Sequence, residues 1–105
     1  MIQLIDRREI PRLLSFCKGS PYGVRISAFL QAYGTSYPFA LFWMQTDASG
    51  RITAALSRVD GHVTLCASEQ ADWEEVWAFL SAAGYESVLC PEWAAQTCLL
   101  YTSPS

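Results

Sequence analysis

The chain has 105 residues, of which 51% are hydrophobic, 13% aromatic and 16% charged, and its net charge is −3. This composition excludes a disordered chain, and the length is that of one domain. Basic residues cluster only at Arg7, Arg8 and Arg12, so nucleic acid and anionic membranes are poor partners. No apolar run approaches the roughly 18 residues that span a bilayer, and the first residues lack a secretory signal pattern. We therefore expect a cytoplasmic protein.

The first third of the chain predicts one strand and two helices. A short apolar run at residues 3–5 predicts the strand. Apolar residues then recur at i, i+3, i+4 and i+7 from Ile10 onward, and Pro11 is tolerated only if the helix begins near that point. The same spacing predicts a second helix over 24–33, which Gly34 should end.

The middle of the chain predicts three strands joined by tight turns. Residues 39–46 are apolar on both faces, which is typical of an interior strand covered on both sides. The loop "DASG" (47–50) leads to a return strand over 51–59. The dipeptide "DG" (60–61) is a strong hairpin turn before a third strand over 62–68.

A third helix is predicted to begin at Asp72, which has the spacing of a capping box with Glu75, and to end at Gly84. Its apolar stripe is made by Trp73, Val76, Trp77 and Leu80. Residues 85–91 then predict a strand, which a right-handed crossover would place parallel to its neighbour. Residues 92–97 have the composition to open one more helix.

The predicted order is strand, helix, helix, three strands, helix and strand. This order indicates an α/β (α+β) fold with a mixed sheet, antiparallel in the middle and parallel at the crossover. The four cysteines stand apart in apolar runs, without C-x-x-C or zinc-ligand spacing, so we expect buried free thiols and no metal site. They are Cys17, Cys66, Cys90 and Cys98.

Residues 1–93 resemble the first two-thirds of the GNAT acetyltransferase fold. The resemblance rests on three segments: "REIPRLLSFCKGSPYGVRISAFLQAYG", "FALFWMQTDASGRITAALSRVDGHVTLCAS" and "DWEEVWAFLSAAGYESVLCPEW". More specifically, the chain is similar to the amino-terminal, degenerate half of two-part GNAT proteins of Firmicute type. The resemblance implies a parent protein that transfers acetyl from acetyl-CoA to an amine by direct attack with a general base.

The chain departs from the family at the segment that should hold the cofactor. GNAT enzymes bind the acetyl-CoA pyrophosphate with a Q/R-x-x-G-x-G/A loop at the start of the crossover helix, where backbone N–H groups reach the phosphates. Here the segment Ala67–Glu75 reads "ASEQADWEE", with no Gly and no Arg. Acidic residues suit a helix N-terminus that binds no ligand and would repel a pyrophosphate. We expect this chain alone to bind no acetyl-CoA.

Candidate reactive residues have simpler structural interpretations. Cys66 and His62 share a strand face, but four strand residues span about 13 Å, too far for a nucleophile–base pair. Glu69 and Asp72 are candidate general bases near a substrate amine, although helix capping is the better interpretation of both. The catalytic residues therefore stay unassigned.

Aromatic residues near the helices have two interpretations. Trp73 and Trp77 lie at i and i+4 of a helix stripe, which favours core packing over a ligand platform. Tyr22, Tyr33 and Tyr37 flank the helix pair that, by the GNAT resemblance, borders the substrate groove.

The final eight residues, "CLLYTSPS" (98–105), follow no pattern set by what precedes them. They match in order the peptide encoded by a transposase end sequence used as a sequencing adapter. We therefore expect residues 98–105 to be a non-native tail and residues 1–97 to be a single GNAT-like domain that is incomplete at its C-terminal end. The alternative is a native strand-like tail.

Two functional hypotheses follow. In the first, the chain is the amino-terminal part of a GNAT-family N-acetyltransferase, inactive alone, and its partner is a downstream GNAT domain or a second copy. Acetyl-CoA is then the cofactor of the parent protein. In the second, the chain is a non-enzymatic α/β module that packs on, or dimerises with, another domain.

Overall fold

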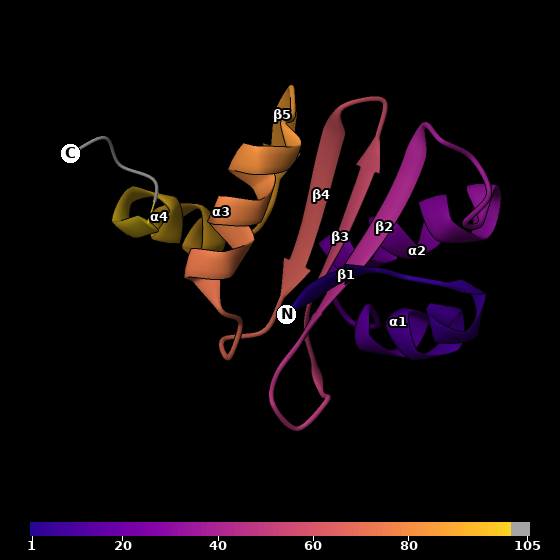
Figure 1. Ribbon diagram of the computed structural model, residues 1–105, viewed down its shortest axis with the longest axis horizontal. Coiled ribbons are helices and arrows are strands. Elements are labelled where there is room, and N and C mark those ends of the chain that lie inside the picture. Colours follow the sequence, from indigo (N-terminus) through magenta and orange to yellow (C-terminus); the bar gives the residue numbers. More distant parts are fainter. Residues whose placement is uncertain (102–105) are drawn as a thin grey trace.

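The computed structural model describes residues 1–101, with the side chains of residues 1–98. Of the predicted foreign tail, residues 102–105 therefore lie outside the described residues. A five-stranded sheet forms the centre of the molecule, and its spatial order follows the chain (Figure 1). The strands are β1 (Ile2–Leu4), β2 (Ala40–Thr46), β3 (Ile52–Val59), β4 (His62–Ala67) and β5 (Ser87–Leu89). The first four strands pair antiparallel, and β5 pairs parallel with β4.

Helices cover both faces of the sheet, which makes a three-layer α+β fold (Figure 1). One face carries the 3-10 turn η1 (Arg7–Glu9), α1 (Ile10–Phe16) and α2 (Pro21–Tyr33). The other face carries α3 (Trp73–Ala83) and α4 (Glu92–Tyr101), which pack against each other. The mixed α+β prediction is therefore confirmed at the level of fold class.

The alternation of side chains along β2 and β3 divides the core into two clusters. The cluster under α1 and α2 has these buried members: Ile5, Leu13, Cys17, Ile26, Leu30, Ala40, Phe42, Met44, Ala55 and Cys66. The cluster under α3 has Ala54, Leu56, Val63, Leu65, Ala71, Val76, Trp77 and Leu80. Successive strand residues point to opposite faces, so the apolar run of β2 serves both clusters, as expected of an interior strand.

Several boundaries differ from the sequence prediction. The second helix begins at Pro21 rather than at residue 24, because the Ser20 hydroxyl accepts from the Gly23 N–H and proline suits the first helical turn. The last strand is limited to Ser87–Leu89 instead of 85–91, since only these residues pair with β4. The proposed helix after residue 91 is present as α4.

The turn at Asp60 and Gly61 has the predicted hairpin geometry. Both residues have positive φ, 52° and 85°, as a two-residue turn of the primed type requires. This turn brings β3 and β4 into the register that pairs Val59 with His62 and Ala54 with Ala67. It thereby places the far end of β4 beside the start of α3, where the candidate site lies.

Candidate functional site

The parallel pairing of β4 with β5 ends before β4 leads into α3. Pairing between β4 and β5 ends at Thr64 and Leu89, while β4 continues to Ala67. Within residues 1–101, no strand pairs with the last residues of β4 on that side. Open α/β sheets bind ligands beyond the carboxyl ends of parallel strands. By this rule, the segment after Ala67 is the candidate ligand-binding site.

The N-terminus of α3 is already occupied by side chains of this chain. The Asp72 carboxylate accepts from the Glu75 N–H at 3.1 Å, which caps the helix as predicted. The Gln45 side chain, only 1% exposed, accepts from the Asp72 N–H at 2.9 Å and donates to the Asp72 carbonyl at 3.0 Å. Two of the backbone groups that an anion would bind are therefore engaged by protein.

Glu75 holds negative charge at the same helix end. Its carboxylate accepts from the Gln45 amide at 2.9 Å and lies 3.0 Å from the Met1 amine. Burial alone would raise the pKa of Glu75, but the hydrogen bond from Gln45 and the Met1 amine together lower it. The carboxylate is thus kept ionised. The second half of the predicted capping box is wrong, because Glu75 turns to Gln45 and Met1 rather than back to the Asp72 N–H.

Cys66 and His62 do not form a reactive pair, in agreement with the distance argument. Cys66 is buried in the cluster under α1 and α2. His62 is exposed at the start of β4, where its Nδ1 is hydrogen-bonded to the Ser87 hydroxyl at 2.8 Å and its Nε2 lies 3.5 Å from the Glu86 carboxylate.

The serine, histidine and glutamate just described form a group that sequence reasoning missed. Ser87, His62 and Glu86 have the residue types of a hydrolytic triad. All three are exposed. The hydrogen bond between His62 and Ser87 joins the start of β4 to β5.

The tryptophans confirm the packing interpretation. Trp77 is 3% exposed, and its indole N–H donates to the Thr97 hydroxyl at 2.6 Å. Trp73 stacks on Trp77 with ring centroids 6.4 Å apart and meets Trp93 edge to face at 5.5 Å. These rings join α3 to α4.

The predicted tyrosine group is only partly assembled. Tyr33 meets Tyr37 edge to face at 6.4 Å and Phe39 at 5.1 Å, so these three form an aromatic group where α2 leads into β2. Tyr22 instead packs partly buried against the core under α1 and α2. Glu69, the other candidate base, is exposed in the loop before α3.

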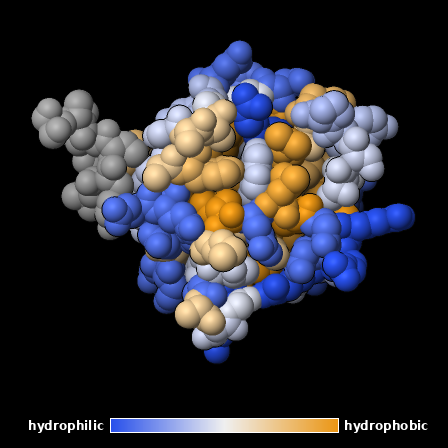
Figure 2. Space-filling view, viewed as in Figure 1, coloured by the Kyte–Doolittle hydropathy of each residue, from blue (hydrophilic) through white to orange (hydrophobic). Residues whose placement is uncertain are grey.

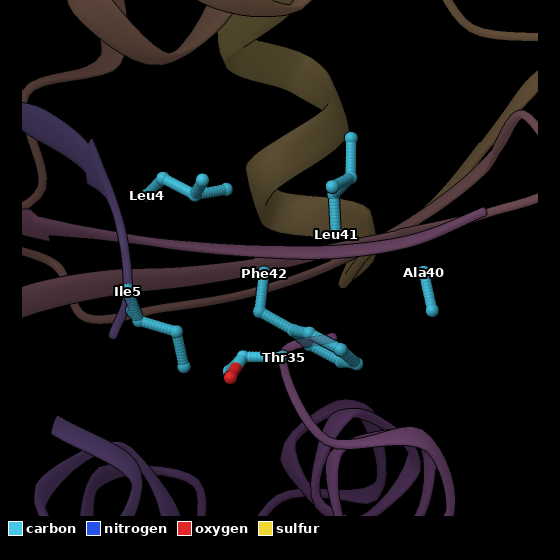
Figure 3. A pocket seen from close by; sticks show the side chains of 6 residues that line it. All are labelled: Leu4, Ile5, Thr35, Ala40, Leu41 and Phe42. Atoms are coloured by element: carbon cyan, nitrogen blue, oxygen red, sulfur yellow. The ribbon is translucent and has the colours of Figure 1, made fainter. Parts of the chain in front are cut away.

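One cavity beside the sheet is small. Figure 3 shows a cavity around β2, with Leu4 and Leu41 on one side of the strand and Ile5 and Phe42 on the other. Its volume is about 20 Å³, which is room for one water molecule. A larger, open hollow beside the loop before α3 is lined by Asp47, Arg51, Ile52, Thr53, Ser68 and Gln70.

Among residues 1–101, no group of three His, Cys, Asp or Glu side chains is placed to hold a metal ion. Nor does that part of the chain contain a helix with the length and apolar character needed to cross a bilayer.

The fold and this helix end define a three-layer α+β domain in which Asp72 and Gln45 engage the N-terminus of the crossover helix α3. No family model, curated protein or solved structure matches the chain.

Proposed function

We propose that this chain is a GNAT-like domain from the amino-terminal part of an N-acetyltransferase and that it does not itself hold acetyl-CoA. The observation that carries the proposal is the parallel pair β4 and β5, joined by α3, at the end of an antiparallel run of strands. Pairing that stops at Thr64 leaves the end of β4 open beside the crossover helix. This arrangement supports an acyltransferase ancestry.

The contacts at α3 support the second half of the proposal. A pyrophosphate binds a helix N-terminus through unoccupied N–H groups and positive potential. In this chain Asp72 and Gln45 engage those backbone groups, and the ionised Glu75 adds negative charge. Acetyl transfer would therefore depend on a second GNAT domain, with this domain as its packing partner.

The ancestry is tested by the gene. We expect the coding sequence of the same locus beyond codon 97 to continue into a GNAT domain with Q/R-x-x-G-x-G/A after a strand. Its absence over about 150 further residues, one domain length, would reject the acetyltransferase assignment.

The closed helix end is tested separately by calorimetry with acetyl-CoA. We expect no binding heat with this chain at ligand concentrations up to about 1 mM. Micromolar binding would show that the side chains at the start of α3 do not prevent acetyl-CoA binding. It would not bear on the proposed acetyltransferase ancestry. The longer protein from the locus is the matched positive control, because its second domain should bind.

A packing or dimerisation module is the second candidate, favoured by exposed apolar side chains at both edges of the sheet. Leu4 on β1 is 59% exposed and Leu89 on β5 is 47% exposed, with Trp93 nearby in sequence at 43%. Figure 2 shows apolar residues gathered across the middle of one face between polar margins. Unprotected strand edges with apolar side chains favour association.

Light scattering over a range of protein concentrations tests this candidate. We expect association that Leu89→Lys weakens, because a charge at the β5 edge opposes pairing. Val24→Lys, at a more exposed position on α2 (60% against 47% for Leu89), is the control and should not weaken it. A monomer at all concentrations would exclude self-association as the role of this chain.

A further inference from the structure

Two cysteines distant in sequence meet between the sheet and the helix pair. Cys17 caps the C-terminal end of α1, and Cys66 lies on β4. They are 1% and 6% exposed and belong to the same buried cluster. Their thiols lie close enough to shift each other's pKa, and neither is in a disulfide. The fold therefore brings together a thiol pair that the sequence spacing did not indicate.

The start of α2 makes the two thiols unequal. Ser20, the N-cap of α2, accepts from the Gly23 N–H and is hydrogen-bonded to the Cys66 thiol. The hydrogen bond with Cys17 is the main cause that lowers the pKa of Cys66, to about 7; burial opposes it and Ser20 adds to it. The hydrogen bond with Cys66 and burial both raise the pKa of Cys17. Cys66 is thus the more easily ionised of the two thiols.

A surface groove reaches Cys17, one member of this pair. It lies between α1 and α2, has a volume of about 480 Å³ and is lined by Leu14, Cys17, Lys18, Val24, Ser27, Ala28 and Gln31. A molecule as small as hydrogen peroxide fits this groove and needs only a local opening to reach the sulfur atoms. The location is separate from the α3 terminus and does not depend on the proposed function.

We propose that Cys17 and Cys66 form a reversible disulfide when the protein meets hydrogen peroxide. The Cys66 thiolate attacks one peroxide oxygen, the O–O bond breaks, and the departing hydroxide takes up a proton to give water and a sulfenic acid on Cys66. The Cys17 sulfur then attacks the Cys66 sulfur. The S–O bond breaks, and the hydroxide leaves as water with the Cys17 proton. Two thiols are oxidised and one peroxide is reduced to two waters.

The first test uses the full chain with Cys90 and Cys98 replaced (C90S/C98S), so that only the proposed pair can react. After peroxide treatment of the folded protein, we expect the intact mass to fall by two hydrogen atoms. Peptide mapping should join Cys17 to Cys66 within one chain, and dithiothreitol should reverse the change. A mass unchanged under conditions that oxidise the urea-unfolded variant, or a link found only between chains, overturns the proposal.

The second test separates the roles of the two sulfurs. C17S/C90S/C98S keeps only Cys66, and peroxide should stop at a sulfenic acid that dimedone traps. C66S/C90S/C98S keeps only Cys17 and should react more slowly, because burial still raises the pKa of Cys17 when Cys66 is absent. Equal rates would contradict the assignment. Disulfide mapping on the unaltered chain decides the main proposal even if a serine at either core position prevents folding.

Discussion

Gln45 is a buried amide that ties three parts of the chain together. Its carbonyl oxygen accepts from the Thr53 hydroxyl at 2.7 Å and from the Asp72 N–H, and its amide nitrogen donates to the Asp72 carbonyl and to Glu75. A buried side chain with both ends satisfied specifies one arrangement of its neighbours. Gln45 therefore sets where the start of α3 lies on the sheet.

Replacing Gln45 with leucine should destabilise the fold by about 2–3 kcal/mol, because the Asp72 N–H and the Thr53 hydroxyl would lose buried partners. The free energy of unfolding from urea titration measures the effect. Gln31→Leu, on the exposed side of α2, is the matched control and should stay within about 0.5 kcal/mol of the unaltered chain. Equal effects of the two substitutions would mean that the Gln45 contacts contribute nothing.

Glu75 should make the free energy of unfolding depend on pH in the acidic range. Its pKa in the folded chain lies below the ordinary value of 4.5, so its contribution is fully present above pH 4.5 and is lost as the pH falls through the folded-state value. We expect Glu75→Gln to reduce the loss of stability between about pH 5 and pH 3. Denaturant titrations at several pH values measure this slope. Glu74→Gln, at the exposed neighbouring position, should keep the full slope.

The corner between α1 and α2 depends on a residue without a side chain. A Cβ atom at Gly23 would lie 2.0 Å from the carbonyl oxygen of Cys17, and backbone cannot yield as a flexible side chain does. This close approach lets α2 begin directly after α1 and sets Ser20 beside Cys66. The backbone contact at Gly23 thus sets the position of Ser20 beside the thiol pair.

Gly23→Ala should therefore cost at least about 2 kcal/mol in unfolding free energy, although alanine favours helices by roughly 1 kcal/mol over glycine. Thermal unfolding followed by circular dichroism measures the loss. Val24→Ala, one position along and 60% exposed, is the matched control and should change stability little. A Gly23→Ala chain as stable as the original would show that the corner can open without cost.

The whole molecule consists of two apolar clusters on opposite faces of one sheet, so distant core changes should act independently. Ile26→Val, under α2, should cost about 0.5–1.5 kcal/mol, and Leu80→Ala, on α3, about 2–5 kcal/mol. Because the sheet separates the two sites, the double variant should match the sum within about 0.5 kcal/mol, measured by urea unfolding. A larger deviation would indicate that the clusters are coupled through β3.

The helices and the tight turn were predictable because their signals are local. Asp72 and Gly84 mark the ends of α3 within a residue of where the sequence places them, and the Asp60–Gly61 turn has the expected positive φ values. The start of α2 was missed although its signal was present. Ser20 before Pro21 is a cap followed by a first-turn proline, but the surrounding glycines favoured a turn.

Contacts between distant segments explain the remaining differences. The length of β5 depends on how far β4 accompanies it, which no pattern within residues 85–91 contains. The engagement of Asp72 and Glu75 by Gln45 joins β2 to α3 across 27 and 30 residues. The sequence showed acidic residues at this helix end, while the hydrogen bonds that occupy its backbone appear only in the folded chain.

The sequence alone determines the α+β class and the order of helices and strands, because periodicity and capping act over a few residues. The acidic, glycine-free segment Ala67–Glu75 can likewise be recognised from the sequence alone. The meeting of Cys17 with Cys66 and of Gln45 with α3 required the fold, because both depend on how helices pack across a sheet rather than on neighbouring residues.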